Sequence, residues 1–288
     1  MPQTINTNIA SLNAQRNMNS SQSSLATSMQ RLSSGLRVNS AKDDAAGMAI
    51  AERMNAQVRG MNVAIRNAND GISLAQTAEG ALGKTADALQ RMRELAVQSA
   101  NASNSDDDKD SLDEEFGQLA QEMQRVLSGT TFNSKNILAA DAGAQVFQIG
   151  ANTTTNDSIT VTTVDMTIDG TITAVAGTDN AGTGRPVIDN TANQAAINTV
   201  IDNIDTALDT INSQRAIFGA TQSRFDAVIS NLQISVENQS AARARIMDAD
   251  FAAETAALSR AQILQQAGNA MIAQANQLPQ QVLKLLQG

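Results

Sequence analysis

The sequence predicts a mainly α fold: an elongated antiparallel rod of coiled-coil-like helices, with a small β-hairpin element and a short exposed tip in the middle of the chain. Two long apolar stripes with helical spacing and a composition almost free of aromatic rings lead to this prediction. Of the 288 residues, 42% are hydrophobic but only 2% are aromatic, with six Phe and no Trp or Tyr. The core therefore has to be aliphatic and rich in alanine.

The two ends of the chain predict a terminal helical domain formed by residues 1–42 and 245–288. Near each end, large apolar residues recur with 4,3 or seven-residue spacing, which gives each helix a narrow apolar seam. A pair of such helices leaves apolar surface uncovered, so we expect neighbouring copies of the chain to cover it. The expected polymerisation seam consists of Leu25, Met29, Leu32, Leu36, Leu264, Met271, Leu278 and Leu285.

A turn at Gly35 and Asn39–Ser40 is followed by a predicted helix from about residue 43 to about residue 100. At 1.5 Å per residue, such a helix is on the order of 85 Å long. It keeps its helical apolar spacing although glycine in a helix costs up to about 1 kcal/mol relative to alanine. We interpret the glycines as points of close approach between neighbouring helices: Gly60, Gly71, Gly80 and Gly83.

The middle of the chain has a different texture, with no Lys or Arg from Asn136 through Gly184. Short alternating runs near residues 145–168 predict strands separated by turns, including a third strand over Val164–Ile168. Glycines and Pro186 in the next segment predict a short variable tip at residues 165–193. The long-helix wall domain is then residues 43–164 together with residues 194–244.

The second long helix is predicted by an apolar stripe that runs from Ile197 to Val236 in strict 4,3 spacing, which strands cannot use. Only Arg215 and Gln222 interrupt the stripe. Its members are Ile197, Ile201, Ile204, Leu208, Ile211, Arg215, Phe218, Gln222, Phe225, Ile229, Leu232 and Val236.

Composition excludes most chemistry. The net charge of −9 argues against a nucleic-acid partner, because phosphate neutralisation needs clustered Lys and Arg. The chain has no His and no Cys, so it cannot form a zinc site, a Ser-His-Asp triad or a Cys-His pair. No apolar run is long enough to span a bilayer, and the first residues lack the pattern of a cleavable secretory signal. We therefore expect no enzyme activity and no cofactor.

Two local patterns imitate binding sites. The run Gly80–Thr85 reads GALGKT, but a phosphate-binding loop needs Gly at position 78, where the chain has Ala78. The acidic run from Asp106 to Asp110 starts like a calcium loop, but its sixth position is Ser111 rather than Gly. A solvated turn between helices is the better interpretation of the acidic run.

Several long motifs, in order, resemble bacterial flagellin. They are INTNIASLNAQRN at Ile5–Asn17, LSSGLRVNSAKDDAAGMAIAERM at Leu32–Met54, QRMRELAVQSAN at Gln90–Asn101, FGATQSRFDAVISNL at Phe218–Leu232, and ARIMDADFAAETAALSRAQILQQAGNAMIAQANQLPQQVLKLL at Ala244–Leu286. The resemblance implies a structural subunit that polymerises into the extracellular flagellar filament, the helical propeller for motility. The middle of the chain is shorter than in many relatives, so a smooth, thin filament is expected.

The resemblance also implies partners. It predicts a homopolymer, an export chaperone on the C-terminal helix, and contacts with the flagellar export apparatus and with hook-junction and cap proteins. Arg91, Leu95 and Glu115 match the surface that a host toll-like receptor reads in related flagellins. A hook-filament junction protein is the alternative function, because it shares the logic of the termini. A coiled-coil scaffold or adhesin explains the stripes but not the ordered motifs.

Overall fold

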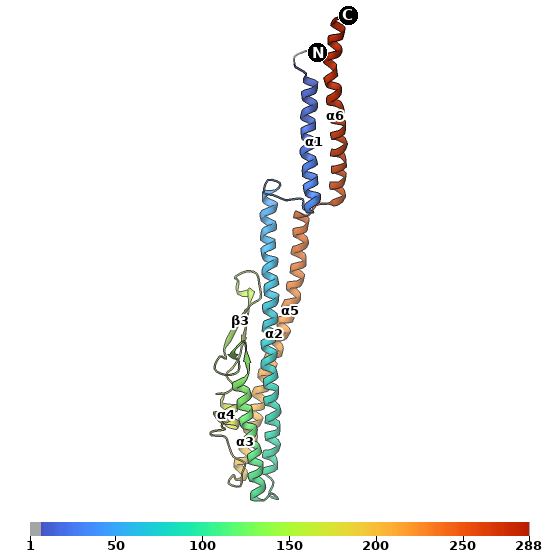
Figure 1. Ribbon diagram of the computed structural model, residues 1–288. Coiled ribbons are helices and arrows are strands. Elements are labelled where there is room, and N and C mark those ends of the chain that lie inside the picture. Colours follow the sequence, from blue (N-terminus) through green and yellow to red (C-terminus); the bar gives the residue numbers. More distant parts are fainter. Residues whose placement is uncertain (1–6, 288) are drawn as a thin grey trace. The chain divides into compact units, whose positions relative to one another are not determined.

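The computed structural model describes residues 7–287, with side chains described through residue 277. The helices are α1 (Ile9–Ser34), α2 (Ala45–Ser99), α3 (Asp106–Gly129), α4 (Gly170–Ala176), α5 (Gln194–Met247) and α6 (Phe251–Gln287) (Figure 1). The strands are β1 (Thr131–Phe132), β2 (Lys135–Asn136), β3 (Ala144–Gln148) and β4 (Ser158–Thr162). The mainly α expectation is confirmed.

The chain divides into two compact units. The first contains Met1–Ala56 and Glu237–Gly288, and the second contains Gln57–Val236. Both boundaries fall inside the long helices α2 and α5, whereas the sequence places the division at the turns near residues 42 and 245. The two long helices therefore contribute residues to both units.

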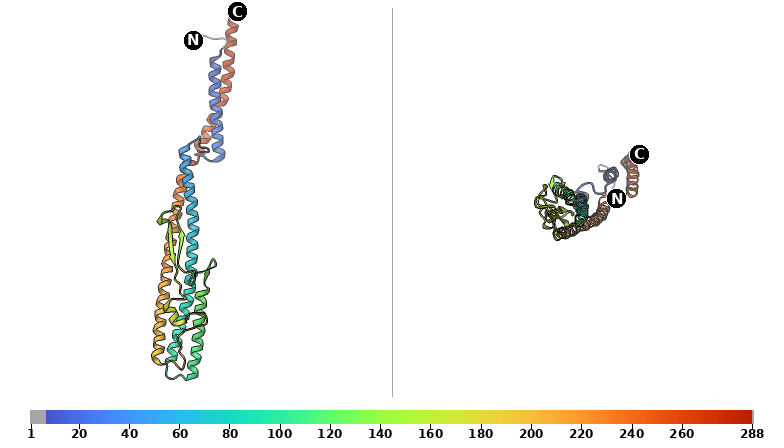
Figure 2. Two further views of the ribbon diagram at one scale, coloured as in Figure 1. Left: turned by 90° about the vertical axis from the view of Figure 1, so that its left-hand side faces the viewer. Right: turned by 90° about the horizontal axis from the view of Figure 1, so that it is seen from below.

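In the second unit, α2 and α5 lie side by side with α3 (Figure 2). Every seventh residue of the predicted stripe from Ile197 to Phe225 is buried on α5, and a matching heptad on α2 is buried with it. These residues are Ile197, Ile204, Ile211, Phe218 and Phe225 on α5, and Ala68, Ala75, Leu82, Leu89 and Ala96 on α2. The polar residue Gln222 fits the stripe because its amide donates to Glu79 Oε2 at 2.9 Å.

The acidic run opens α3 and forms its N-terminal cap. The Ser105 hydroxyl accepts from the backbone N–H of Asp108 at 3.2 Å, and the Asp108 carboxylate accepts from the Ser105 N–H at 3.0 Å. This reciprocal pair satisfies backbone groups that the helix itself cannot. Negative charge in the first turn also suits the helix dipole. The acidic residues are therefore part of a helix start rather than only a solvated turn.

The predicted β element is an antiparallel hairpin of β3 and β4, with Phe147 opposite Ile159. Its inner face is fixed by Phe147, whose ring meets Phe225 edge to face with the ring centres 5.8 Å apart. The expected third strand over Val164–Ile168 does not form. The backbone N–H of Met166 instead donates to Leu138 O at 2.9 Å, in the loop that precedes the hairpin.

Of the four glycines predicted to mark close approaches between helices, Gly71 approaches α5, Gly60 approaches the loop residue Ala151, and the other two approach nothing. A methyl group added at Gly60 would lie 2.8 Å from the Ala151 Cβ, and one added at Gly71 would lie 2.6 Å from the Phe225 ring. The prediction is wrong for Gly80 and Gly83, where an added methyl group would meet nothing within 4 Å. Sequence spacing alone could not separate the two pairs, because all four glycines interrupt the same helical pattern.

The segment predicted to be an exposed tip is mostly packed. Ile172, Val175, Ala176 and Ile188 are fully buried in the core of the second unit. The longest exposed stretch in this segment is residues 178–184, and Ile168 and Val187 are exposed singly. The expectation of a tip over residues 165–193 is therefore corrected: apolar residues of α4 and Ile188 fold the segment back onto the unit, since exposing them would forfeit their burial.

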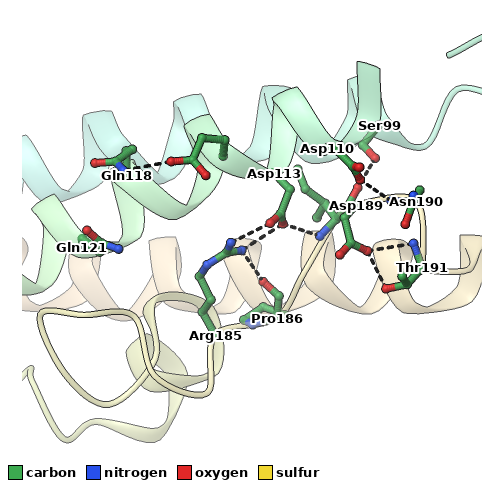
Figure 3. A network of polar contacts seen from close by, with 12 residues as sticks. Ser99, Asp110, Asp113, Gln118, Gln121, Arg185, Pro186, Asp189, Asn190 and Thr191 are labelled. Atoms are coloured by element: carbon green, nitrogen blue, oxygen red, sulfur yellow. Dashed lines mark hydrogen bonds and ion pairs between the residues drawn. The ribbon is translucent and has the colours of Figure 1, made fainter. Parts of the chain in front are cut away.

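Side chains of α2 and α3 hold this segment by its backbone (Figure 3). The Asp113 carboxylate of α3 accepts from Arg185 Nη1 at 2.9 Å, from Nη2 at 2.6 Å and from the Ile188 N–H at 2.8 Å. The Ser99 hydroxyl of α2 donates to Ile188 O. Farther along α3, Gln124 donates to Gly177 O at 2.7 Å. The buried polar groups of a segment without regular structure thus find partners.

Candidate assembly surface

The first unit is built on the antiparallel pair of α1 and α6, which run side by side (Figure 1). The Asn8 side chain donates to Ala275 O at 2.8 Å, and the Ser11 hydroxyl donates to Asn276 Oδ1 at 2.9 Å. At the other end of the pair, Arg31 lies 3.8 Å from Glu254. The residues that the pair buries are small: Ser11, Ser28, Ala261 and Ala275. Small side chains allow the two helices to approach closely.

Large apolar side chains of the same two helices face solvent. We call them the terminal apolar surface, and they are Ile9, Leu12, Met29, Phe251, Ile263, Leu264 and Met271. Burying a side chain of this kind stabilises a structure by about 1.5–3 kcal/mol. Exposure of several of them on one helix pair is typical of a surface that binds another protein.

This arrangement differs in part from the one expected from the sequence. The spacing predicts that the Leu and Met seams of the two helices pair with each other and leave some apolar surface for neighbouring copies. The structure places small residues between α1 and α6 and leaves Met29, Leu264 and Met271 exposed. Leu25, Leu32 and Leu36 are partly buried. Leu278 and Leu285 lie outside the residues whose side chains are described, and the polymerisation role of all eight seam residues stays a prediction.

Four residues of the terminal apolar surface were missed by the sequence analysis: Ile9, Leu12, Phe251 and Ile263. Ile9 and Leu12 are three residues apart on α1, and Ile263 precedes Leu264 directly on α6. Helical spacing could have placed Ile9 beside Leu12. It could not have shown that the small residues would occupy the contact between the helices.

Two short connections meet where α1 ends and α6 begins. Gly35 closes α1 with a φ of 72°, a left-handed conformation that favours glycine. The Arg37 N–H donates to Met247 O at 2.6 Å, and the Ala249 N–H donates to Gly35 O at 2.9 Å. Beneath them, Val38, Ala51 and Met247 form a small core. The connection from α1 to α2 is thus tied to the connection from α5 to α6.

Of the three residues that resemble a receptor-binding surface, Arg91 and Glu115 lie together on the surface of the second unit, and Leu95 is buried. Arg91 of α2 donates to Glu115 of α3 at 2.8 Å and to Glu94 at 3.0 Å. The hydrogen bond to Glu115, and to a smaller extent the one to Glu94, raises the pKa of Arg91 above its ordinary value. Leu95 is 0% exposed, so it supports this surface from the core. Arg91 and Glu115 are its accessible members.

Within the residues that the structure describes, no group of three or more Asp or Glu side chains is placed to hold a metal ion. None of the described helices is long and apolar enough to cross a membrane.

Comparison with known proteins places the chain in a family. The model of the bacterial flagellin N-terminal helical region matches residues 5–142, and the model of the C-terminal helical region matches residues 201–286. A flagellin of Halalkalibacterium halodurans is 45% identical over 282 residues, covering 98% of this chain and 99% of that protein. A flagellin of Bacillus subtilis is 41% identical over 302 residues, again covering 98% and 99%.

A solved structure is also similar. The crystal structure of Bacillus cereus flagellin is 31% identical and covers 58% of this chain and 88% of that chain, with a TM-score of 0.47. The two helical regions and the nearly full-length relatives agree with the motifs at both ends of the sequence. The chain therefore belongs to the bacterial flagellin family and is a structural subunit of the flagellar filament, not an enzyme.

Proposed function

We propose that the terminal apolar surface is where neighbouring subunits contact one another in the filament. The observation that carries the proposal is the exposure of Met29, Leu264 and Met271 on a helix pair whose most deeply buried residues, among the side chains described through residue 277, are small. A two-helix pair with such an interior gains little from its own packing, because most helical stability in proteins comes from burying an apolar face. Contact between copies supplies that burial.

Hydrogen bonds already position the pair for such contacts. Asn8 and Ser11 link α1 to the part of α6 around Ala275, and Arg31 faces Glu254 at the other end. These polar contacts fix the register of the two helices. The large apolar residues are then presented in a fixed pattern to another copy, and association has less conformational entropy to overcome.

A seeded elongation assay tests the proposal. Subunits carrying Ile263→Gln and Leu264→Gln are depolymerised, returned to neutral pH with short wild-type seeds, and followed by electron microscopy and sedimentation. We expect elongation to slow by about tenfold or more, because each change removes an apolar group that the contact buries. The matched control is Ile168→Gln, which changes an exposed apolar residue of the second unit.

Elongation of the double variant at the wild-type rate would contradict the proposal. Wild-type subunits that cap the seeds without extending them would instead indicate a hook-filament junction protein. In a truncated chain ending at Ile263, we expect loss of polymerisation with retention of the folded second unit, because that unit has its own buried core.

Further partners follow from the same surfaces. We infer that an export chaperone covers Ile263, Leu264 and Met271 on α6 before the chain passes through the export apparatus, since an exposed apolar helix face invites aggregation. Hook-junction and cap proteins then meet the subunit at the ends of the extracellular filament. We also propose that a host toll-like receptor binds Arg91 and Glu115. The variant Arg91→Ala should weaken receptor binding. The control Arg125→Ala changes an exposed residue of α3 and should leave receptor binding unchanged.

A further inference from the structure

Methionine is the only readily oxidised type of side chain in this sequence. It contains no Cys, Trp, Tyr or His, but it contains 11 Met. Peroxides oxidise the methionine thioether to a sulfoxide, and exposed thioethers react first. The thioethers are therefore the main targets of a peroxide in this protein.

The methionines are unevenly exposed. Met92, Met123 and Met166 are buried in the core of the second unit, and Met61 and Met247 are also buried. Among the methionines whose side chains are described, only Met29 at 57% and Met271 at 62% are largely exposed. Both belong to the terminal apolar surface. An oxidant will therefore modify the proposed assembly surface before it reaches the core.

We propose that Met29 and Met271 are oxidation sites that control assembly, so that a peroxide blocks incorporation of the free subunit into the filament. This inference rests on the proposed function of the terminal apolar surface. A lone pair of the thioether sulfur attacks one peroxide oxygen, an S–O bond forms and the O–O bond breaks. The sulfur loses two electrons to the peroxide, the proton on the transferred oxygen moves to the departing hydroxide, and this second oxygen leaves as water.

The change acts on assembly and leaves the fold of the free subunit intact. In the free subunit, a sulfoxide at Met29 or Met271 remains in water, where its oxygen is hydrated. In a contact between copies, the same oxygen loses its water, and burial of a polar group without a hydrogen bond is costly. Oxidation of Met29 and Met271 therefore weakens association and leaves the core of the second unit unchanged.

The same geometry predicts protection in the filament. When neighbouring copies cover Met29 and Met271, peroxide no longer reaches them, so the oxidation applies to free subunits that neither another copy nor the proposed export chaperone covers. Methionine sulfoxide is reversible by methionine sulfoxide reductases. Treatment of oxidised subunits with these enzymes should restore elongation, which distinguishes the effect from irreversible damage.

The first measurement compares the oxidation rates of free subunits and filaments in hydrogen peroxide. Peptide mass spectrometry after trypsin reads Met271 directly, because it is the only methionine between Ala261 and Lys284. Fragment spectra separate Met29 from Met18, which share a tryptic peptide. We expect both Met29 and Met271 to oxidise about tenfold faster in the free subunit than in the filament, because exposure controls the reaction.

The second measurement follows elongation of unoxidised seeds by oxidised subunits. We expect wild-type elongation to fall by about tenfold or more, because buried sulfoxides replace apolar groups. The Met29→Leu, Met271→Leu variant keeps a similar volume and should elongate normally after peroxide treatment. The control variant Met48→Leu, Met54→Leu removes two partly buried methionines of α2 and should stay as sensitive as the wild type.

The outcomes separate the two claims. Equal oxidation of Met29 and Met271 in free subunits and filaments would mean that the terminal apolar surface is uncovered, which overturns the proposed function together with this inference. Protection in the filament, combined with normal elongation of oxidised subunits, would overturn only the inference. Loss of elongation in the oxidised Met29→Leu, Met271→Leu variant would assign the effect to other residues and would also overturn it.

Discussion

Asp113 and Arg185, 72 residues apart in the sequence, form an ion pair with two hydrogen bonds of 2.9 Å and 2.6 Å. The guanidinium also lies over the Phe116 ring, 5.9 Å from its centre. Asp113 additionally accepts from the Ile188 N–H. A single carboxylate of α3 thus fixes both the side chain and the backbone of the segment that follows α4 (Figure 3).

Replacing Asp113 with Asn should destabilise the second unit by about 2–4 kcal/mol, because Arg185 keeps its charge in a largely buried position without its partner. The measurement is urea unfolding of the full-length subunit at neutral pH. Glu122→Gln is the control, since its ion pair with Arg125 is exposed and such pairs contribute about 0–1 kcal/mol. Similar small effects of both changes would show that the segment is held by apolar burial alone.

The stability of the second unit should fall in acid partly through Asp113. Burial raises the pKa of Asp113, but hydrogen bonds from Arg185 and the Ile188 N–H and the Arg185 charge outweigh it, so the pKa lies below its ordinary value. The unfolded chain therefore binds this proton more readily than the folded one. The resulting stability is complete above about pH 3.9, the ordinary pKa of aspartate, and is lost as the pH falls below it.

Unfolding free energies of the wild type and of Asp113→Asn, measured from neutral pH to below pH 3.9, test this sign. The difference between the two proteins should shrink as the pH falls, because the wild type loses the stabilisation that the variant lacks throughout. Other carboxylates with lowered pKa, such as Asp108 beside Ser105, are common to both proteins and cancel in the comparison. A constant difference would rule out Asp113 as a source of acid sensitivity.

Replacing Gly71 with Ala should destabilise the second unit by about 1–3 kcal/mol through overpacking, which exceeds the gain in helix propensity. The added methyl group would lie 2.6 Å from the Phe225 ring, and that ring cannot move freely because it is fully buried against Phe147. Thermal unfolding measures the change. Gly80→Ala is the matched variant: it has open space and should stabilise the free subunit by up to about 1 kcal/mol.

Replacing Ser105 with Ala should destabilise the second unit by about 1 kcal/mol, because the Asp108 N–H loses its capping acceptor. Urea unfolding at neutral pH measures the effect. Ser111→Ala is a suitable control, since the Ser111 hydroxyl only donates to Asp107 O on the same exposed helix face. If Ser105→Ala and Ser111→Ala behave alike, the capping pair does not define the start of α3.

Sequence periodicity predicted the long helices because the same face of each helix is buried turn after turn, so apolar residues recur at a fixed spacing. The heptad from Ile197 to Phe225 is buried as expected, and β3 and β4 form where alternating residues indicated strands. Periodicity could not show which residues a distant part of the chain covers. Leu95 shares a motif with Arg91 but lies in the core, and Ile188 is buried because Asp113 and Ser99 hold its backbone.

The sequence by itself determined the helical composition of the chain, the absence of nucleophilic and metal-binding chemistry based on Cys or His, and the family motifs at both ends. Tertiary structure decided which face of each helix is covered. A period of seven shows that Leu264 and Met271 lie on one face of α6, but it does not identify the group opposite them. In the structure Ala261 and Ala275 are buried against α1, because small side chains permit the closer approach, and large apolar side chains such as Leu264 and Met271 remain exposed.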